Sequence, residues 1–227
     1  MLGNAIATAH INQLTGSFVM SLNGVAINED TTNAALTLHW PPSLQIVNER
    51  FFDFCQANKA LRIERTALGD CEIMAPTGGA TGWRNLTLAA QLYNWAEQDG
   101  SGIAFDSSTG YMLPNGAIRS PDVSWVKRTQ LAVLTPEQKQ RFLPLCPDFV
   151  IELRSPSDSV KTLQEKMQEY IQNGTHVAWL IDPENQQAVV FQAEVPRVVL
   201  NKPEFLQADG LLAGFRLDLL KIWGVGF

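Results

Sequence analysis

The sequence has few of the residues that build disulfide frameworks or multi-histidine metal centres. Among its 227 residues there are three cysteines and three histidines: Cys55, Cys71, Cys146, His10, His39 and His176. An odd number of widely separated cysteines argues against a disulfide framework or a zinc ribbon. We therefore expect reduced, free thiols.

Long apolar runs and an excess of positive charge are also absent. No stretch approaches the roughly 18 apolar residues that cross a bilayer. Residues 1–4 lack the basic start of a secretory signal, so we expect a cytoplasmic protein with no membrane partner. The formal net charge of −6 excludes a global positive field, and a nucleic-acid partner would need a local basic patch or a bridging cation.

Enough apolar material is present for a packed core, with 45% apolar and 18% charged residues. Residues 1–42 differ from the rest, because they are rich in Ala, Asn and Thr and end in Trp40-Pro41-Pro42. We expect an N-terminal extension over 1–42, partly strand-like near 17–22 and partly disordered. Residues 43–227 should then form one domain.

Residue patterns in that domain predict a mixed arrangement of strands and helices. Strands are expected at 61–66, 71–75, 102–106, 111–113, 122–126, 149–154, 177–182 and 188–192, the last two as a hairpin. Helices are expected up to about residue 58, over 83–97, just after Thr135, and over 162–172. Without strict alternation, this pattern favours an α/β or α+β fold over a doubly wound nucleotide-binding fold.

The helix over 83–97 follows a glycine-rich turn, Thr77–Gly82, and carries Leu86, Ala89, Ala90 and Tyr93 on one apolar stripe. The turn lacks the Gly-Lys-Ser/Thr ending of a nucleotide-binding loop, so nucleotide binding is not expected. In a nuclease, Arg84 and Asn85 could contact DNA phosphates, although a role in the turn and cap is the simpler interpretation.

The most informative segment is the strand Asp148–Arg154. Side chains alternate along a strand, so Phe149 and Ile151 face one way while Glu152 and Arg154 face the other. A buried carboxylate needs a cation or strong donors nearby. Alternatively, this is an edge strand whose polar face, including a Glu152–Arg154 pair, meets water.

A lysine follows on the next predicted helix. Lys166 shares the apolar stripe of Leu163, Met167 and Tyr170, and we take Thr162–Glu165 as the capping box that sets this phase. The amine either extends outward along its stem or enters a polar site with Glu152. The connection from the strand to this helix is short, so Lys166 could readily reach Glu152.

The third element is Asp122, which follows Pro121 and opens a predicted strand. Alone, it is a common strand-start aspartate. The combination is rarer: Pro-Asp, then Glu152-Leu-Arg154 thirty residues later, then Lys166 fourteen residues further on.

At this point the sequence resembles a known family. Segments in matching order resemble the Uma family of restriction-endonuclease-like proteins, assigned to the PD-(D/E)XK nuclease-like fold: Leu61–Thr66, Ile73–Gly79, Phe105–Gly110, Leu113–Gly116, Arg119–Val126, Cys146–Pro156 and Lys166–Tyr170. The resemblance spans Phe51–Trp223 and implies a mixed central sheet flanked by helices.

The resemblance also implies a metal-dependent DNA endonuclease. By position, Asp122 and Glu152 would hold Mg²⁺ or Mn²⁺, with the backbone carbonyl of Leu153 as a further ligand. The fold usually has a lysine at the position of Arg154. Arginine can bind phosphate but cannot act as a base, so the resemblance assigns the role of the lysine to Lys166 in the next helix. Glu64 matches an acid near the start of the family's core and, by that resemblance, would be a further ligand of the metal or of its water.

Three functions follow as alternatives. The first is a metal-dependent DNA endonuclease acting as a homodimer, because cutting both strands of a symmetric site takes two active sites. The second is a catalytically weak nucleic-acid or protein-binding module, suggested by Arg154 in place of lysine. The third is an unrelated structural or transposon-associated protein.

Overall fold

The computed structural model describes residues 8–11, 18–22, 25–28, 35–40 and 46–227. They divide into two compact units: Met1–Pro76 with Asn115–Arg119, and Thr77–Pro114 with Ser120–Phe227. The expected boundary between residues 42 and 43 stays a prediction, and the expected Pro41-Pro42 linker lies outside the described residues. No helix in these described ranges is long and apolar enough to cross a membrane.

The first unit is built on a sheet with the strand order β1-β2-β3-β4-β6-β5-β9. Its elements are β1 (Thr8–Ile11), β2 (Phe18–Leu22), β3 (Val25–Asn28), β4 (Ala35–His39), α1 (Asn48–Ala57), β5 (Arg62–Arg65), β6 (Cys71–Met74) and β9 (Ile118–Arg119). The strand expected near 17–22 is present as β2. Strand β4, from the predicted extension, pairs antiparallel with β6 of the predicted domain.

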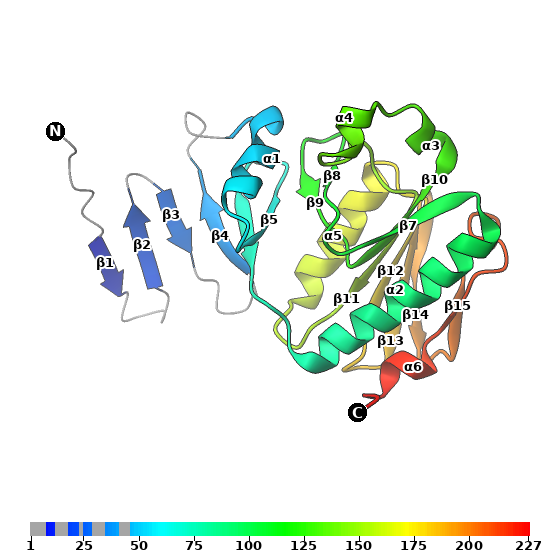
Figure 1. The fold of residues 1–227 in the computed structure, drawn as a ribbon. Helices are drawn as coiled ribbons and strands as arrows, with labels where there is room; N and C mark the ends of the chain where they lie inside the picture. The colour runs from blue at the N-terminus through cyan, green and yellow to red at the C-terminus, as the bar shows by residue number, and fades with distance from the viewer. Residues whose placement is uncertain (1–7, 12–17, 23–24, 29–34, 41–45) are drawn as a thin grey trace. The chain divides into compact units, whose positions relative to one another are not determined.

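The second unit is built on a mixed sheet with the order β14-β13-β12-β11-β10-β7 (Figure 1). Its strands are β7 (Gly102–Asp106), β10 (Val123–Lys127), β11 (Phe149–Leu153), β12 (Val177–Asp182), β13 (Gln187–Gln192) and β14 (Val195–Asn201). Strand β11 is central, antiparallel to β10 and parallel to β12. The predicted mixed sheet and the hairpin of β12 and β13 are confirmed. Shorter elements complete the unit: β8 (Tyr111–Met112), α3 (Arg128–Ala132), α4 (Pro136–Lys139), β15 (Phe205–Gln207), β16 (Arg216–Asp218) and α6 (Leu220–Trp223).

Two long helices, α2 (Gly79–Asp99) and α5 (Val160–Gln172), pack on this sheet. Phe149, Ile151 and Leu153 of β11 join the core cluster that contains the buried side chains of α2. Glu152, from the opposite face of the same strand, contacts α5. The alternation predicted for this strand is therefore confirmed, and α2 and α5 lie on opposite faces of the sheet.

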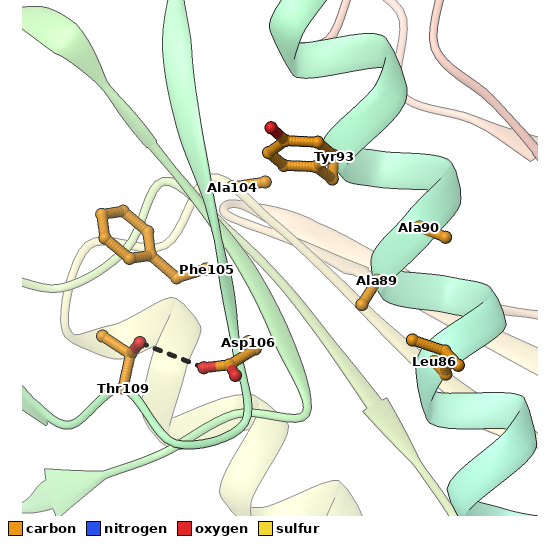
Figure 2. A pocket seen from close by; sticks show the side chains of 8 residues that line it. All are labelled: Leu86, Ala89, Ala90, Tyr93, Ala104, Phe105, Asp106 and Thr109. Carbon is orange, nitrogen blue, oxygen red and sulfur yellow. Dashed lines mark hydrogen bonds between the residues drawn. The ribbon is translucent and has the colours of Figure 1, made fainter.

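The apolar stripe identified on α2 from sequence is not the buried one. The core-facing side chains are Leu88, Leu92 and Ala96, whereas Leu86 is 69% and Tyr93 is 54% exposed. Both stripes have helical spacing, so periodicity could not choose between them. The exposed stripe instead lines an apolar groove against Ala104 and Phe105 of the edge strand β7; the groove also includes Asp106 and Thr109 (Figure 2).

The start of α5 also differs from expectation. The helix begins at Val160, and Ser159 is its N-cap, with its hydroxyl accepting a hydrogen bond from the amide of Thr162 at 3.4 Å. The predicted capping box at Thr162–Glu165 is therefore wrong. Ser159 and Thr162 are both good N-cap residues, and the earlier one is used. The phase of the helix is unchanged, because Met167 and Tyr170 are buried as expected.

Candidate active site

Asp122 and Glu152 are placed together by the register of β10 and β11. Val123 pairs with Ile151 at the end of this antiparallel ladder; Asp122 comes just before Val123, and Glu152 comes just after Ile151. Two carboxylates thirty residues apart in sequence thus share one end of the sheet.

Asp122 is fixed by hydrogen bonds from two directions. Its Oδ2 accepts from the backbone amide of Leu153 at 2.9 Å, and its Oδ1 accepts from Nδ2 of Asn85 at 3.4 Å. Asp122 lies just before β10 begins. Its side-chain carboxylate, rather than a backbone carbonyl of β10, therefore accepts the hydrogen bond from the amide of Leu153 in β11. The carboxylate is therefore tied both to the neighbouring strand and to α2.

Glu152 is buried, with 4% of its surface exposed, and Oε1 is bound by two groups from α5. Nζ of Lys166 lies 2.8 Å away, and the hydroxyl of Tyr170 donates to the same oxygen at 3.2 Å. The solvent-exposed edge strand considered as an alternative is thus excluded. The amine of Lys166 does not extend outward either, because it enters the predicted polar site, where its charge balances the carboxylate.

Arg154 directly follows β11, at the same end of the strand as Glu152, and is held by acidic partners. Its guanidinium donates to Asp182 at 3.1 and 3.2 Å and lies 2.7 Å from Glu184. Burial opposes ionisation of Asp182, but hydrogen bonds from Asn185 and Arg154 outweigh it and hold the pKa of Asp182 below its ordinary value. Arg154 therefore links the ends of β11 and β12.

Glu64, the fifth predicted residue, lies in the first unit. It is 2% exposed on β5, and its carboxylate pairs with Arg119 at 3.2 Å; Arg119 also pairs with Glu72. The second unit brings together Asp122, Glu152 and Lys166, with Arg154 at the end of the same strand. A role for Glu64 at that site stays a prediction.

Two further side chains reach the site without having been assigned to it from sequence. Tyr170 was placed on the apolar stripe of α5, yet its hydroxyl bonds Glu152. Buried tyrosine hydroxyls usually have a hydrogen-bond partner, so the predicted burial of Tyr170 could have indicated that its hydroxyl contacts a polar group. Asn85 was considered for phosphate contact, but it contacts Asp122; its neighbour Arg84 instead donates to the carbonyl of Ile222 at 2.8 Å.

The donor set suits a hard divalent cation more than a zinc-type centre. Within the described part of the chain, no group of three or more His, Cys, Asp or Glu side chains is arranged to hold a metal ion. The site nevertheless offers oxygen donors from Asp122 and Glu152, and Oδ1 of Asn85 is buried without a hydrogen-bond partner among the described residues. Two carboxylates with neutral oxygens fit Mg²⁺, which usually keeps several waters.

The cysteines are free, as expected. Burial raises the pKa of Cys146 to about 11, and burial together with nearby Cys71 does the same for Cys55. Their thiols are therefore protonated at neutral pH and are poor nucleophiles.

Comparison with known proteins gives a family and a fold. The family model described as "Putative restriction endonuclease" (Uma2) matches residues 48–220. Among solved structures, the chain is similar to a putative nuclease belonging to DUF820 from Anabaena variabilis ATCC 29413. The TM-score is 0.61 and the identity 17%, over 71% of this chain and 89% of that chain. A search of curated proteins found no match.

Proposed function

The chain belongs to the Uma2 family, described as "Putative restriction endonuclease", and from this membership we propose that it is a divalent-metal-dependent nuclease that hydrolyses phosphodiester bonds of DNA. The observation that carries the proposal is the placement of Asp122 and Glu152 at the same end of the β10–β11 ladder, with Lys166 2.8 Å from Glu152. Action as a homodimer and a cytoplasmic location stay predictions.

Asp122 and Glu152 would hold the cation, with the backbone carbonyl of Leu153 as a further oxygen ligand. When bound, Mg²⁺ or Mn²⁺ supplies positive charge that polarises the scissile phosphate and lowers the pKa of a coordinated water. The overall charge of −6 makes such a bridge useful, because the acidic chain has no global field to attract DNA.

Lys166 would orient the attacking water by donating a hydrogen bond to it, and its positive charge would offset the negative charge of the phosphate. Tyr170 would keep the carboxylate of Glu152 in place, because its hydroxyl donates to the same oxygen as Lys166. Arg154 cannot act as a base, but its positive charge at the end of β11 would add electrostatic stabilisation.

Cleavage of supercoiled plasmid DNA tests the proposal. Wild-type protein with Mg²⁺ or Mn²⁺ should nick or linearise the plasmid, and EDTA should stop the reaction. Asp122→Ala and Glu152→Ala should each reduce the rate by at least about a hundredfold. The exposed Asp209→Ala and Glu97→Ala serve as matched controls and should cut like wild type.

Metal titration distinguishes the alternative of a non-catalytic binding module. Carboxylate-dependent binding of Mg²⁺ without cleavage of any tested DNA would favour the catalytically weak module. Cleavage that persists in both carboxylate variants would reject the assignment of the site.

A further inference from the structure

Asn85 makes a contact that fixes the orientation of its amide. Nδ2 lies 3.4 Å from Oδ1 of Asp122, which stands thirty-seven residues away in the chain. A carboxylate only accepts hydrogen bonds, so the NH₂ group must face Asp122 and the carbonyl oxygen must be the other end of the amide.

That carbonyl oxygen, Oδ1, is buried from solvent and accepts no hydrogen bond from the described residues. A buried acceptor without a donor destabilises a fold, because it has given up its hydrogen bonds to water and gains none in return. Such atoms are rare in folded proteins, and a bound water or ion is a usual explanation. Here the atom belongs to the side chain that holds one of the two site carboxylates.

We propose that Asn85 is a positioning residue of the cation site. Its Nδ2 holds Asp122, and its Oδ1 accepts a hydrogen bond from a water molecule in the coordination shell of a divalent cation of the Mg²⁺ type. This inference rests on the proposed function. Mg²⁺ keeps several of its waters when bound by two carboxylates, and those waters need acceptors from the protein.

A purely structural role for Asn85 gives a different expectation. If Asn85 only braced Asp122, its removal would lower the stability of the metal-free chain and leave cation affinity nearly unchanged. As part of the shell, its removal weakens cation binding, whereas the metal-free chain loses only one long hydrogen bond.

Calorimetric titration of the full chain with Mn²⁺ or Mg²⁺, without DNA, separates these roles. Asn85→Ala should weaken binding about tenfold or more, within the range for residues that support metal ligands. Asn94→Ala, an exposed asparagine on the same helix, is the matched control and should bind like wild type. Binding by Asn85→Ala within twofold of wild type would overturn the inference.

A second variant keeps the test informative if Asn85→Ala folds poorly. Asn85→Asp has nearly the same shape and keeps an oxygen acceptor; it loses the Nδ2 donor to Asp122, but its added negative charge attracts the cation, so it should bind the cation at least as tightly as wild type does. Equal weakening in both variants would contradict a contact between Oδ1 and the cation's shell. If wild type itself shows no binding that depends on Asp122 and Glu152, the proposed function fails instead.

Discussion

Nζ of Lys166 lies 2.8 Å from Oε1 of Glu152, and the two side chains are only 13% and 6% exposed. Lys166 comes from α5, and Glu152 comes from near the C-terminal end of the central strand β11. A buried ion pair is weak evidence for stability in itself, but breaking it leaves one buried charge without its partner. The loss of stability on breaking this ion pair can therefore be measured without any substrate.

Lys166→Met should destabilise the fold by about 3–5 kcal/mol, because Glu152 loses its cation in a buried position. Urea unfolding followed by tryptophan fluorescence measures this. Lys161→Met changes a lysine on the same helix that is 85% exposed, so it should stay within about 0.5 kcal/mol of wild type. Adding Glu152→Gln to Lys166→Met should recover part of the loss, and strict additivity of the two changes would argue against the pair.

Tyr170→Phe removes only the hydroxyl that donates to Glu152. Since the acceptor is a carboxylate, we expect a loss of about 1.5–3 kcal/mol in unfolding free energy. Tyr93→Phe on the exposed stripe of α2 is the control and should have almost no effect. Indistinguishable unfolding curves for Tyr170→Phe and wild type would show that the hydroxyl does not support the carboxylate.

Leu88 and Leu86 lie two positions apart on α2 but face different surroundings. Leu88→Ala should cost about 2–5 kcal/mol, because Leu88 is fully buried in the core. Leu86→Ala should change unfolding free energy by less than about 0.5 kcal/mol, since its side chain is 69% exposed. Thermal or chemical unfolding of the two variants checks the assignment of faces, and a larger loss for Leu86→Ala would reverse it.

The lowered pKa of Asp182 gives a pH-dependent prediction. A carboxyl whose pKa falls on folding stabilises the fold above its unfolded-state pKa, about 3.9, and loses that contribution as the pH falls through the folded-state value. Asp182→Asn should therefore be less stable than wild type at pH 7, and the difference should shrink below about pH 4. Denaturant midpoints at pH 7 and pH 3 test this; a gap that stays constant would contradict it.

Much of the second unit could be predicted from local pattern. The alternation in β11 gave both the core face and the polar face correctly, and the apolar segment that forms β12 was recognised as a strand. Patterns were less decisive where two choices were chemically alike. Ser159 and Thr162 can both cap a helix, and α2 carries two apolar stripes, so only packing against the sheet selects one.

The parts of the site that sequence could not provide depend on contacts between distant segments. The contact of Asn85 with Asp122 exists only because α2 packs against this sheet. Likewise, the pairing of Arg154 with Asp182 requires β11 and β12 to lie parallel, with Leu153 beside Ile181. Neither contact can be recognised from the neighbouring residues in the sequence. The contact of Glu152 with Lys166 can be, because only a short connection separates their strand and helix.

The pairing of β10 with β11, which sets Asp122 and Glu152 at the same end of the sheet, has a consequence for how the protein can vary in sequence. Backbone ladders, rather than the connecting segment 128–148, determine how far apart the two carboxylates stand. The exposed and half-buried residues 131–140 of that segment can therefore change in number or in surface chemistry without altering this arrangement, whereas Leu143, Cys146 and Asp148 are buried and stay in place. The surface around the site can thus change in sequence while Asp122 and Glu152 keep their positions.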